Sequence, residues 1–213
     1  MNSKDMLLFL EKRKKELYRN QDSIIKKYDD FLAINGVYLS VYKEAYREKI
    51  KGHYELCDGI IKLYQEARLE NEKIVLLEDL LAIGYDKNKL TELVLDVFDT
   101  ADETMDLWHY GDLLYTMRKY KYLPRYLKII ENKSHGTGRQ MVVLLVGKSK
   151  KAEAVPVLKT LLEDPDVYGH AVEALSNFDG QDIEEIMFRF LDCKVTWIRK
   201  KAHRYLTKRG LAK

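Results

Sequence analysis

The C-terminal two thirds of the chain repeats with a period of about 31 residues. Leu114, Leu144, Leu175 and Leu206 are separated by 30, 31 and 31 residues, and a fainter copy lies 33 residues earlier at Leu81. A fixed period of this size is typical of stacked helical hairpins, because each unit can bury its apolar face only against its neighbours. The sequence therefore predicts four or five such hairpins.

The last two units agree at four positions counted from the repeated leucine. Val167, Ala171, Ala174 and Leu175 recur as Ile198, Ala202, Tyr205 and Leu206. At 3.6 residues per turn these positions lie on one side of a helix, so we expect that side to be buried. Each unit then adds a second apolar segment with helical spacing, at residues 90–98, 123–130, 155–162 and 183–191.

Turn-forming residues mark where these helices begin and end. Asp164-Pro165-Asp166 suits a helix start, and residues 177–180 form a stop-and-turn signal. The other prolines, Pro124 and Pro156, also fall at predicted helix starts. No segment has the alternating pattern of a strand, so the predicted fold class is all-α.

These residues resemble a known family. Residues 137–210 are similar to HEAT repeats, above all in the runs 161–167 (LLEDPDV) and 170–175 (HAVEAL). More narrowly, residues 108–114, 136–141 and 197–200 resemble a group of uncharacterised bacterial HEAT-repeat domain-containing proteins. The resemblance covers roughly residues 71–210 and implies a right-handed α-solenoid of the armadillo/HEAT type. It also implies that the second helix of each hairpin lines the concave side.

Length and composition favour one continuous domain, with capping helices in residues 1–70 and the repeat array in residues 71–213. Cys57 and Cys193 are too few for a disulfide framework or a zinc-ligand pattern, which favours a reducing cytoplasm. The apolar run 6–10 precedes its basic residues, unlike a signal peptide, and the run 141–146 is too short to span a membrane.

Charge alternates in sign along the chain although the net charge is only +3. Residues 71–106 carry ten acids and three bases, and residues 118–133 carry six bases and one acid. Residues 163–192 then carry nine acids and one arginine, and residues 194–213 carry eight bases and no acid. Such bands suit a protein partner of mixed charge better than duplex DNA, or they are simply solvated faces.

One row of cations emerges from the repeat register. His109, Arg139, His170 and Lys201 occupy the position five residues before the repeated leucine. This position is turned about 140° from the leucine, so we expect an outer stripe. It is either a solvated face or a ladder for an acidic partner, whose charge would grow as the histidines protonate near their ordinary pKa of about 6.5.

We therefore expect a non-enzymatic protein-binding scaffold that needs no cofactor, with another protein as partner, and an acidic segment as one option. The sequence leaves the partner's identity and the oligomeric state open. The candidate contact residues are Trp108, His109, Arg118, Tyr122, Arg125, Tyr126, Lys128, Arg139, Tyr168, His170, Trp197 and Lys201.

An alternative is nucleic-acid binding or base excision. HEAT-like DNA glycosylases hold the surroundings of an alkylated base with tryptophans and stabilise the cationic sugar with a carboxylate. Trp108 and Asp112, one helical turn apart, are similar to that arrangement, with Trp197 as a second aromatic. The acidic residues before Trp108 oppose DNA phosphates. The five histidines do not have metal-pair spacing.

The N-terminal region contains a tyrosine stripe at four-residue spacing, Tyr38, Tyr42 and Tyr46, beside the basic residues Lys43, Arg47, Lys49 and Lys51. It is interpreted as a packing face, and the alternative is an aromatic, basic surface for nucleic acid.

Overall fold

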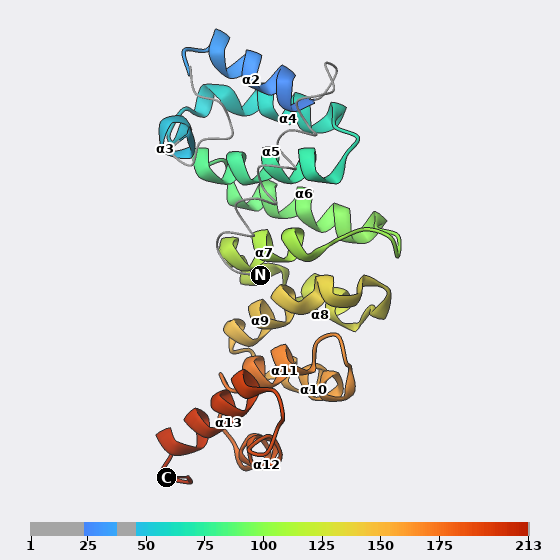
Figure 1. Ribbon diagram of the computed structural model, residues 1–213, viewed down its shortest axis with the longest axis vertical. Helices are drawn as coiled ribbons and strands as arrows, with labels where there is room; N and C mark the ends of the chain where they lie inside the picture. The colour runs from blue at the N-terminus through green and yellow to red at the C-terminus, as the bar shows by residue number, and fades with distance from the viewer. Residues whose placement is uncertain (1–23, 38–45, 213) are drawn as a thin grey trace. The chain divides into compact units, whose positions relative to one another are not determined.

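The computed structural model describes residues 24–37 and 46–212 of the chain. All regular structure in these two ranges is helical, without a strand, which confirms the all-α fold class (Figure 1). The chain groups into two compact units, Met1–Leu90 and Thr91–Lys213. The expected boundary after residue 70 stays a prediction. None of the described helices combines the length and the apolar character that crossing a membrane requires.

The first unit packs α4 against both α2 and α5, while α3 contacts α5. Leu32, Leu56, Ile60, Leu76 and Leu80 are fully buried in its core. Its elements are α2 (Ile24–Ile34), α3 (Tyr46–Ile50), the 3-10 helix η1 (Tyr54–Leu56), α4 (Cys57–Glu66) and α5 (Glu70–Ile83).

A buried carboxylate connects three helices of this unit. Asp79 of α5 accepts hydrogen bonds from the Tyr28 hydroxyl at 2.8 Å and from Arg47 Nε at 3.1 Å. Arg47, part of the expected basic surface, is therefore engaged inside the unit, and it also pairs with Glu78. Tyr38, Tyr42, Lys43 and the side chain of Tyr46 lie outside the described residues, so the tyrosine stripe stays a prediction.

The second unit is a succession of helical layers (Figure 1). Helix α7 packs on α9, α9 on α11 and α11 on α13, while α8, α10 and α12 pack beside α9, α11 and α13. The helices are α6 (Lys87–Thr100, Thr91 onward in this unit), α7 (Trp108–Met117), α8 (Leu123–Glu131), α9 (Gln140–Ser149), α10 (Val155–Thr160), α11 (Tyr168–Leu175), α12 (Gln181–Arg189) and α13 (Thr196–Lys208). Short 3-10 helices join them: η2 (Tyr120–Tyr122), η3 (Lys133–Arg139), η4 (Ala152–Ala154) and η5 (Leu161–Glu163).

The predicted start and stop signals lie where expected. Pro124 and Pro156 occupy the first turns of α8 and α10, where a missing amide hydrogen leaves no helical bond unmade. Helix α11 begins shortly after Pro165 and ends before the turn at Gly180, whose φ of 137° favours glycine. The second apolar segments form α6, α8, α10 and α12, as the spacing predicts.

The predicted repeat register is wrong by two residues in α9. Leu114, Leu175 and Leu206 are fully buried, but Leu144 is only half-buried, and Val146 is the buried residue of α9. The positions one and four residues before Val146 are also buried, as they are before Leu114, Leu175 and Leu206. The uninterrupted apolar run 141–146 hides which of its residues faces the core.

Glycines allow α9, α11 and α13 to approach one another closely. A Cβ on Gly147 of α9 would lie 2.5 Å from the Cα of Ala174 in α11. A Cβ on Gly169 of α11 would lie 2.7 Å from the δ1 methyl of Ile198 in α13. Each layer thus rests on the next through backbone as well as side chains.

Candidate functional site

The ion pairs of the second unit connect successive layers. Every pair among its described residues joins side chains 23 to 33 residues apart, which is about one repeat. The alternating charge bands are therefore, at least at these positions, mutual partners. The pairs are Arg125 with Glu92, Asp96 and Asp99; Arg139 with Asp164 and Asp166; Lys159 with Asp182; Arg189 with Glu163; Lys201 with Glu173; and Arg209 with Asp179.

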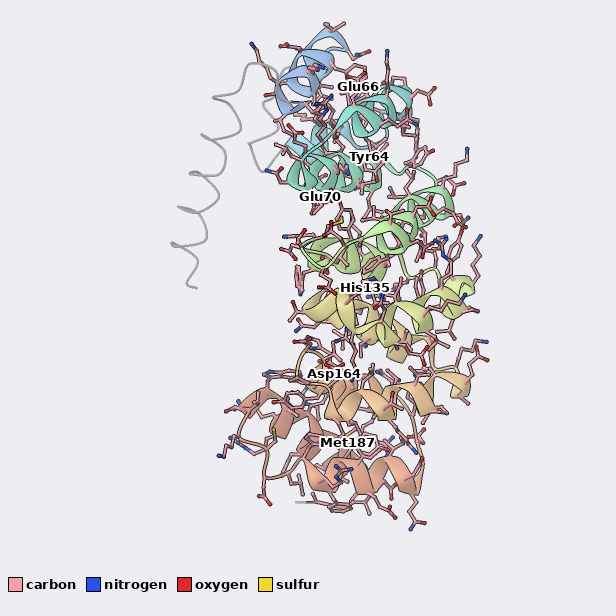
Figure 2. All side chains as sticks on the ribbon, turned by 90° about the vertical axis from the view of Figure 1, so that its right-hand side faces the viewer. Tyr64, Glu66, Glu70, His135, Asp164 and Met187 are labelled. Atoms are coloured by element: carbon pink, nitrogen blue, oxygen red, sulfur yellow. The ribbon has the colours of Figure 1, made fainter. Side chains whose placement is uncertain are left out.

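Arg139 is the buried cation among these ion pairs. The prediction that it lies in an outer, solvent-facing stripe is therefore wrong. Its side chain is fully buried, with Nη1 2.9 Å from Asp164 Oδ2 and Nη2 3.3 Å from Asp164 Oδ1 (Figure 2 labels Asp164). It also donates to the carbonyls of Ile130, at 3.1 Å, and Gly136, at 2.9 Å. With Val146 as the buried anchor, Arg139 lies seven residues before it, not five, which places it near the core face.

Asp164 is held in its charged form by this contact. Burial by itself would raise the pKa of its carboxyl. Hydrogen bonds from Arg139 and from the backbone amide of Asp166 act in the opposite direction, and the pKa lies below its ordinary value. The pair joins the start of α9 to the turn before α11, so it fixes the spacing of two layers.

The other members of the predicted cation row differ in their surroundings. His109 is exposed, with its ring edge-on to Trp108 at 5.3 Å. His170 is half-buried beside the Trp197 ring at 5.6 Å, and burial lowers its pKa although Glu173 opposes the change. Lys201 Nζ pairs with Glu173 Oε1 at 2.6 Å. The four side chains therefore do not form a continuous charged ladder.

The candidates on α8 are also partly engaged within the fold. Tyr126, predicted as a contact residue, is fully buried, and its hydroxyl donates to the Lys119 carbonyl at 3.1 Å. Arg125 Nη1 lies 2.8 Å from Glu92 Oε2, and Nη2 pairs with Asp96 and Asp99. Tyr126 is thus removed as a contact candidate, and Arg125 is occupied by carboxylates of α6.

Four further candidates keep accessible side chains. Arg118 is exposed in a left-handed conformation at the end of α7, with its guanidinium 5.7 Å from the Tyr115 ring centre. Lys128 is exposed in the last turn of α8, while Tyr122 and Tyr168 are half-buried.

The residues of the base-excision alternative lie in separate layers. Trp108 opens α7 and is 37% exposed, whereas Trp197 lies in the first turn of α13 and is 43% exposed. Helices α9 and α11 lie between α7 and α13 in the packing order, so Trp197 does not join Trp108 and Asp112 as a second aromatic. The residue types fit a base pocket, but their placement does not favour one.

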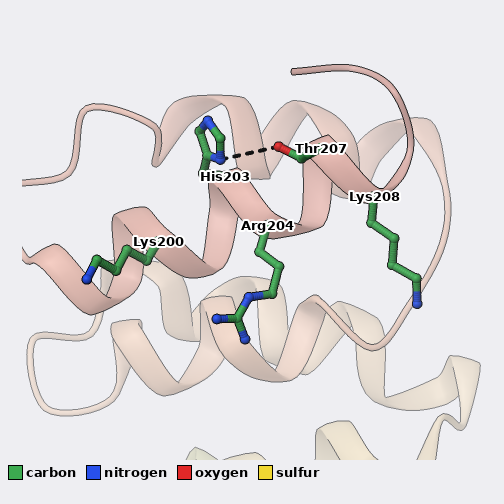
Figure 3. Close-up of a pocket in the computed structure, with 5 residues that line it drawn as sticks. All are labelled: Lys200, His203, Arg204, Thr207 and Lys208. Carbon is green, nitrogen blue, oxygen red and sulfur yellow. Dashed lines mark hydrogen bonds between the residues drawn. The ribbon is translucent and has the colours of Figure 1, made fainter. Parts of the chain in front are cut away.

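The exposed side of α13 is the feature that residue-by-residue reasoning missed. An open depression of about 540 Å³ is lined by Lys200, His203, Arg204, Thr207 and Lys208, here called the α13 basic face (Figure 3). The Thr207 hydroxyl lies 3.2 Å from His203 Nδ1. Lys201 and Arg209, on the same helix, help to line an adjoining depression of about 310 Å³.

The cations of α13 divide into two sets. Arg199 donates to the Cys193 carbonyl, while Lys201 and Arg209 pair with acids of the preceding layer. Lys200, Arg204 and Lys208 have no ion-pair partner in the part of the chain that the structure describes. The sequence indicates a basic surface here, because segment 194–213 contains no acid. Only the ion pairs in the structure distinguish the cations that lack a partner from those that have one.

His135, labelled in Figure 2, lines another depression of about 270 Å³ between the loop before α7 and η3. Its Nε2 lies 3.0 Å from the Asn132 amide nitrogen, and the Asn132 oxygen accepts from Ser134. The Nδ1 of His135 is buried and has no hydrogen-bond partner among the described residues. Burial lowers the pKa of His135. Among the described residues, no group of three or more potential ligands could hold a metal ion.

No protein-family model matches the chain, and no curated protein or solved structure shows significant similarity to it.

Proposed function

We propose that this chain is a non-enzymatic protein-binding module of the cytosol, built as a HEAT-like α-solenoid. The observation that carries the proposal is the one-repeat spacing of the ion pairs, from 23 to 33 residues. A chain folded as a stack places side chains one repeat apart in neighbouring layers. The glycine contacts between α9, α11 and α13 support the same arrangement.

Protein binding is supported by how the charges are used. Four cations of the α8 to α12 layers, Arg125, Arg139, Lys159 and Arg189, are paired with acids of the neighbouring layer, which reduces the net field there for a long polyanion. Accessible aromatic and cationic side chains, including Trp108, Trp197 and Arg118, remain for a partner. Tyr, Trp and Arg are enriched in protein interfaces. The free thiols of Cys57 and Cys193 are compatible with a reducing compartment.

The test is affinity capture with the full chain from a lysate of the source cells, with and without nuclease treatment. We expect specific proteins to be enriched equally in both samples, as read by quantitative mass spectrometry. Enrichment that disappears after nuclease treatment would point to nucleic acid instead. Absence of any enriched protein above a matched helical control would refute the proposal.

A further inference from the structure

We propose that the α13 basic face binds a short acidic peptide segment of a partner protein. This inference rests on the proposed protein-binding function and specifies the partner's chemistry.

The fold itself does not account for the three free cations. Lys200, Arg204 and Lys208 follow one another at four-residue intervals, and like charges at that spacing destabilise a helix. Lys208 is in the last turn, where the helix dipole favours a cation, but Lys200 and Arg204 lie further from that end. Their neighbours Lys201 and Arg209 show that α13 can reach acids of the preceding layer. A row of cations left outside those pairs is available to an external anion.

The spacing of the row matches a peptide. At a rise of 1.5 Å per residue, successive cations are separated by about 6 Å and the row spans about 12 Å. In an extended peptide, alternate side chains point to the same side at intervals of about 6.6 Å. About five residues with acids at the first, third and fifth positions would therefore pair with all three cations.

The surroundings favour a short segment over a nucleic acid. Helix α12, which packs against α13, carries Asp182, Glu184 and Glu185. Asp179, which pairs with Arg209, is the one acid lining the adjoining depression, beside five cations that include Arg204 and Lys208. The α12 carboxylates oppose a long polyphosphate that extends beyond the row onto α12, whereas a segment of about 12 Å can stay on the row itself.

Two exposed apolar side chains lie close in sequence to the two ends of the row. Trp197 is 43% exposed in the first turn of α13, and Leu211 is 42% exposed just after its end. They offer contacts to apolar residues on either side of the acids, with the tryptophan as a large, rigid anchor. The expected motif is an acidic stretch bounded by apolar residues.

The experiment measures fluorescence anisotropy of a labelled ten-residue peptide with glutamate at alternate positions. A matched peptide with glutamines and a ten-residue oligothymidylate are measured in parallel. The test variant is Lys200→Glu/Arg204→Glu/Lys208→Glu, and the control is Lys133→Glu/Lys148→Glu/Lys151→Glu, which reverses three exposed lysines elsewhere. Circular dichroism verifies that both variants stay folded.

We expect the glutamate peptide to bind, the glutamine peptide to bind at least tenfold more weakly, and added salt to weaken binding. The α13 variant should lose about tenfold or more in affinity, while the control loses less than about threefold. Equal loss in both variants, tighter binding of the oligothymidylate, or no binding of the glutamate peptide would each overturn the inference. If the chain captures a protein from nuclease-treated lysate and the α13 variant captures it equally, this inference fails while the proposed function stands.

Discussion

Replacing Arg139 by methionine should strongly destabilise the second unit. The substitution keeps much of the side-chain volume but removes the donors to both Asp164 oxygens and to the carbonyls of Ile130 and Gly136. Asp164 is only 5% exposed, so its carboxylate would remain buried without its cation. Breaking a buried pair by removing one partner costs about 3–5 kcal/mol. Urea unfolding followed by circular dichroism at 222 nm measures this loss.

The matched control is Arg125→Met, the same change at an arginine that contacts three carboxylates, whereas Arg139 contacts two. The Arg125 side chain is 30% exposed and its partners are 49–69% exposed, so water screens these pairs. The expected loss is about 1 kcal/mol or less. Asp164→Leu added to Arg139→Met should recover part of the stability, because the orphaned charge is gone. An Arg139→Met variant no less stable than Arg125→Met would refute the buried pairing.

Three further predictions concern packing, pH and activity. Gly147→Ala should lower the free energy of unfolding by about 1–3 kcal/mol in urea titrations, because the new Cβ meets the Ala174 backbone; an unchanged midpoint would contradict that contact. Burial lowers the pKa of His135 and His170, so the unfolded state binds more protons than the folded state, and the free energy of unfolding should fall as pH drops from 7.5 through 6.5. His170→Gln should reduce this loss. An equal dependence of the free energy of unfolding on pH in the variant and the parent would exclude His170 as a cause. Alkylated DNA incubated with the chain should release no free base, as measured by chromatography. Release of base that Trp108→Ala abolishes would instead establish the glycosylase alternative.

The helices could be predicted from the sequence because their signals are local. Apolar spacing located the second segments, and proline and glycine marked the starts and turns, as at Pro124, Pro156 and Gly180. The register of α9 could not be predicted, because residues 141–146 are all apolar and any of them could face the core. Only packing against α7 and α11 selects Val146 over Leu144.

The candidate site was predicted less well because burial of a charge depends on a distant partner. Arg139 looks like any surface arginine until Asp164, 25 residues later, lies beside it. The alternating charge bands did contain this information. Bands of opposite sign one repeat apart favour pairing between layers, as Arg125 pairs with acids of α6. Interpreting the bands as a partner surface or as solvated faces overlooked the nearest available partner, the neighbouring layer.

Direct contact between helical layers one repeat apart can be measured by nuclear Overhauser effects on methyl-labelled protein. If the layers are stacked, strong cross-peaks will connect the Ala174 methyl with the Gly147 α-protons and the Ile198 δ1 methyl with the Gly169 α-protons. Absence of both cross-peaks, with the methyl resonances assigned and the protein folded, would contradict the stack.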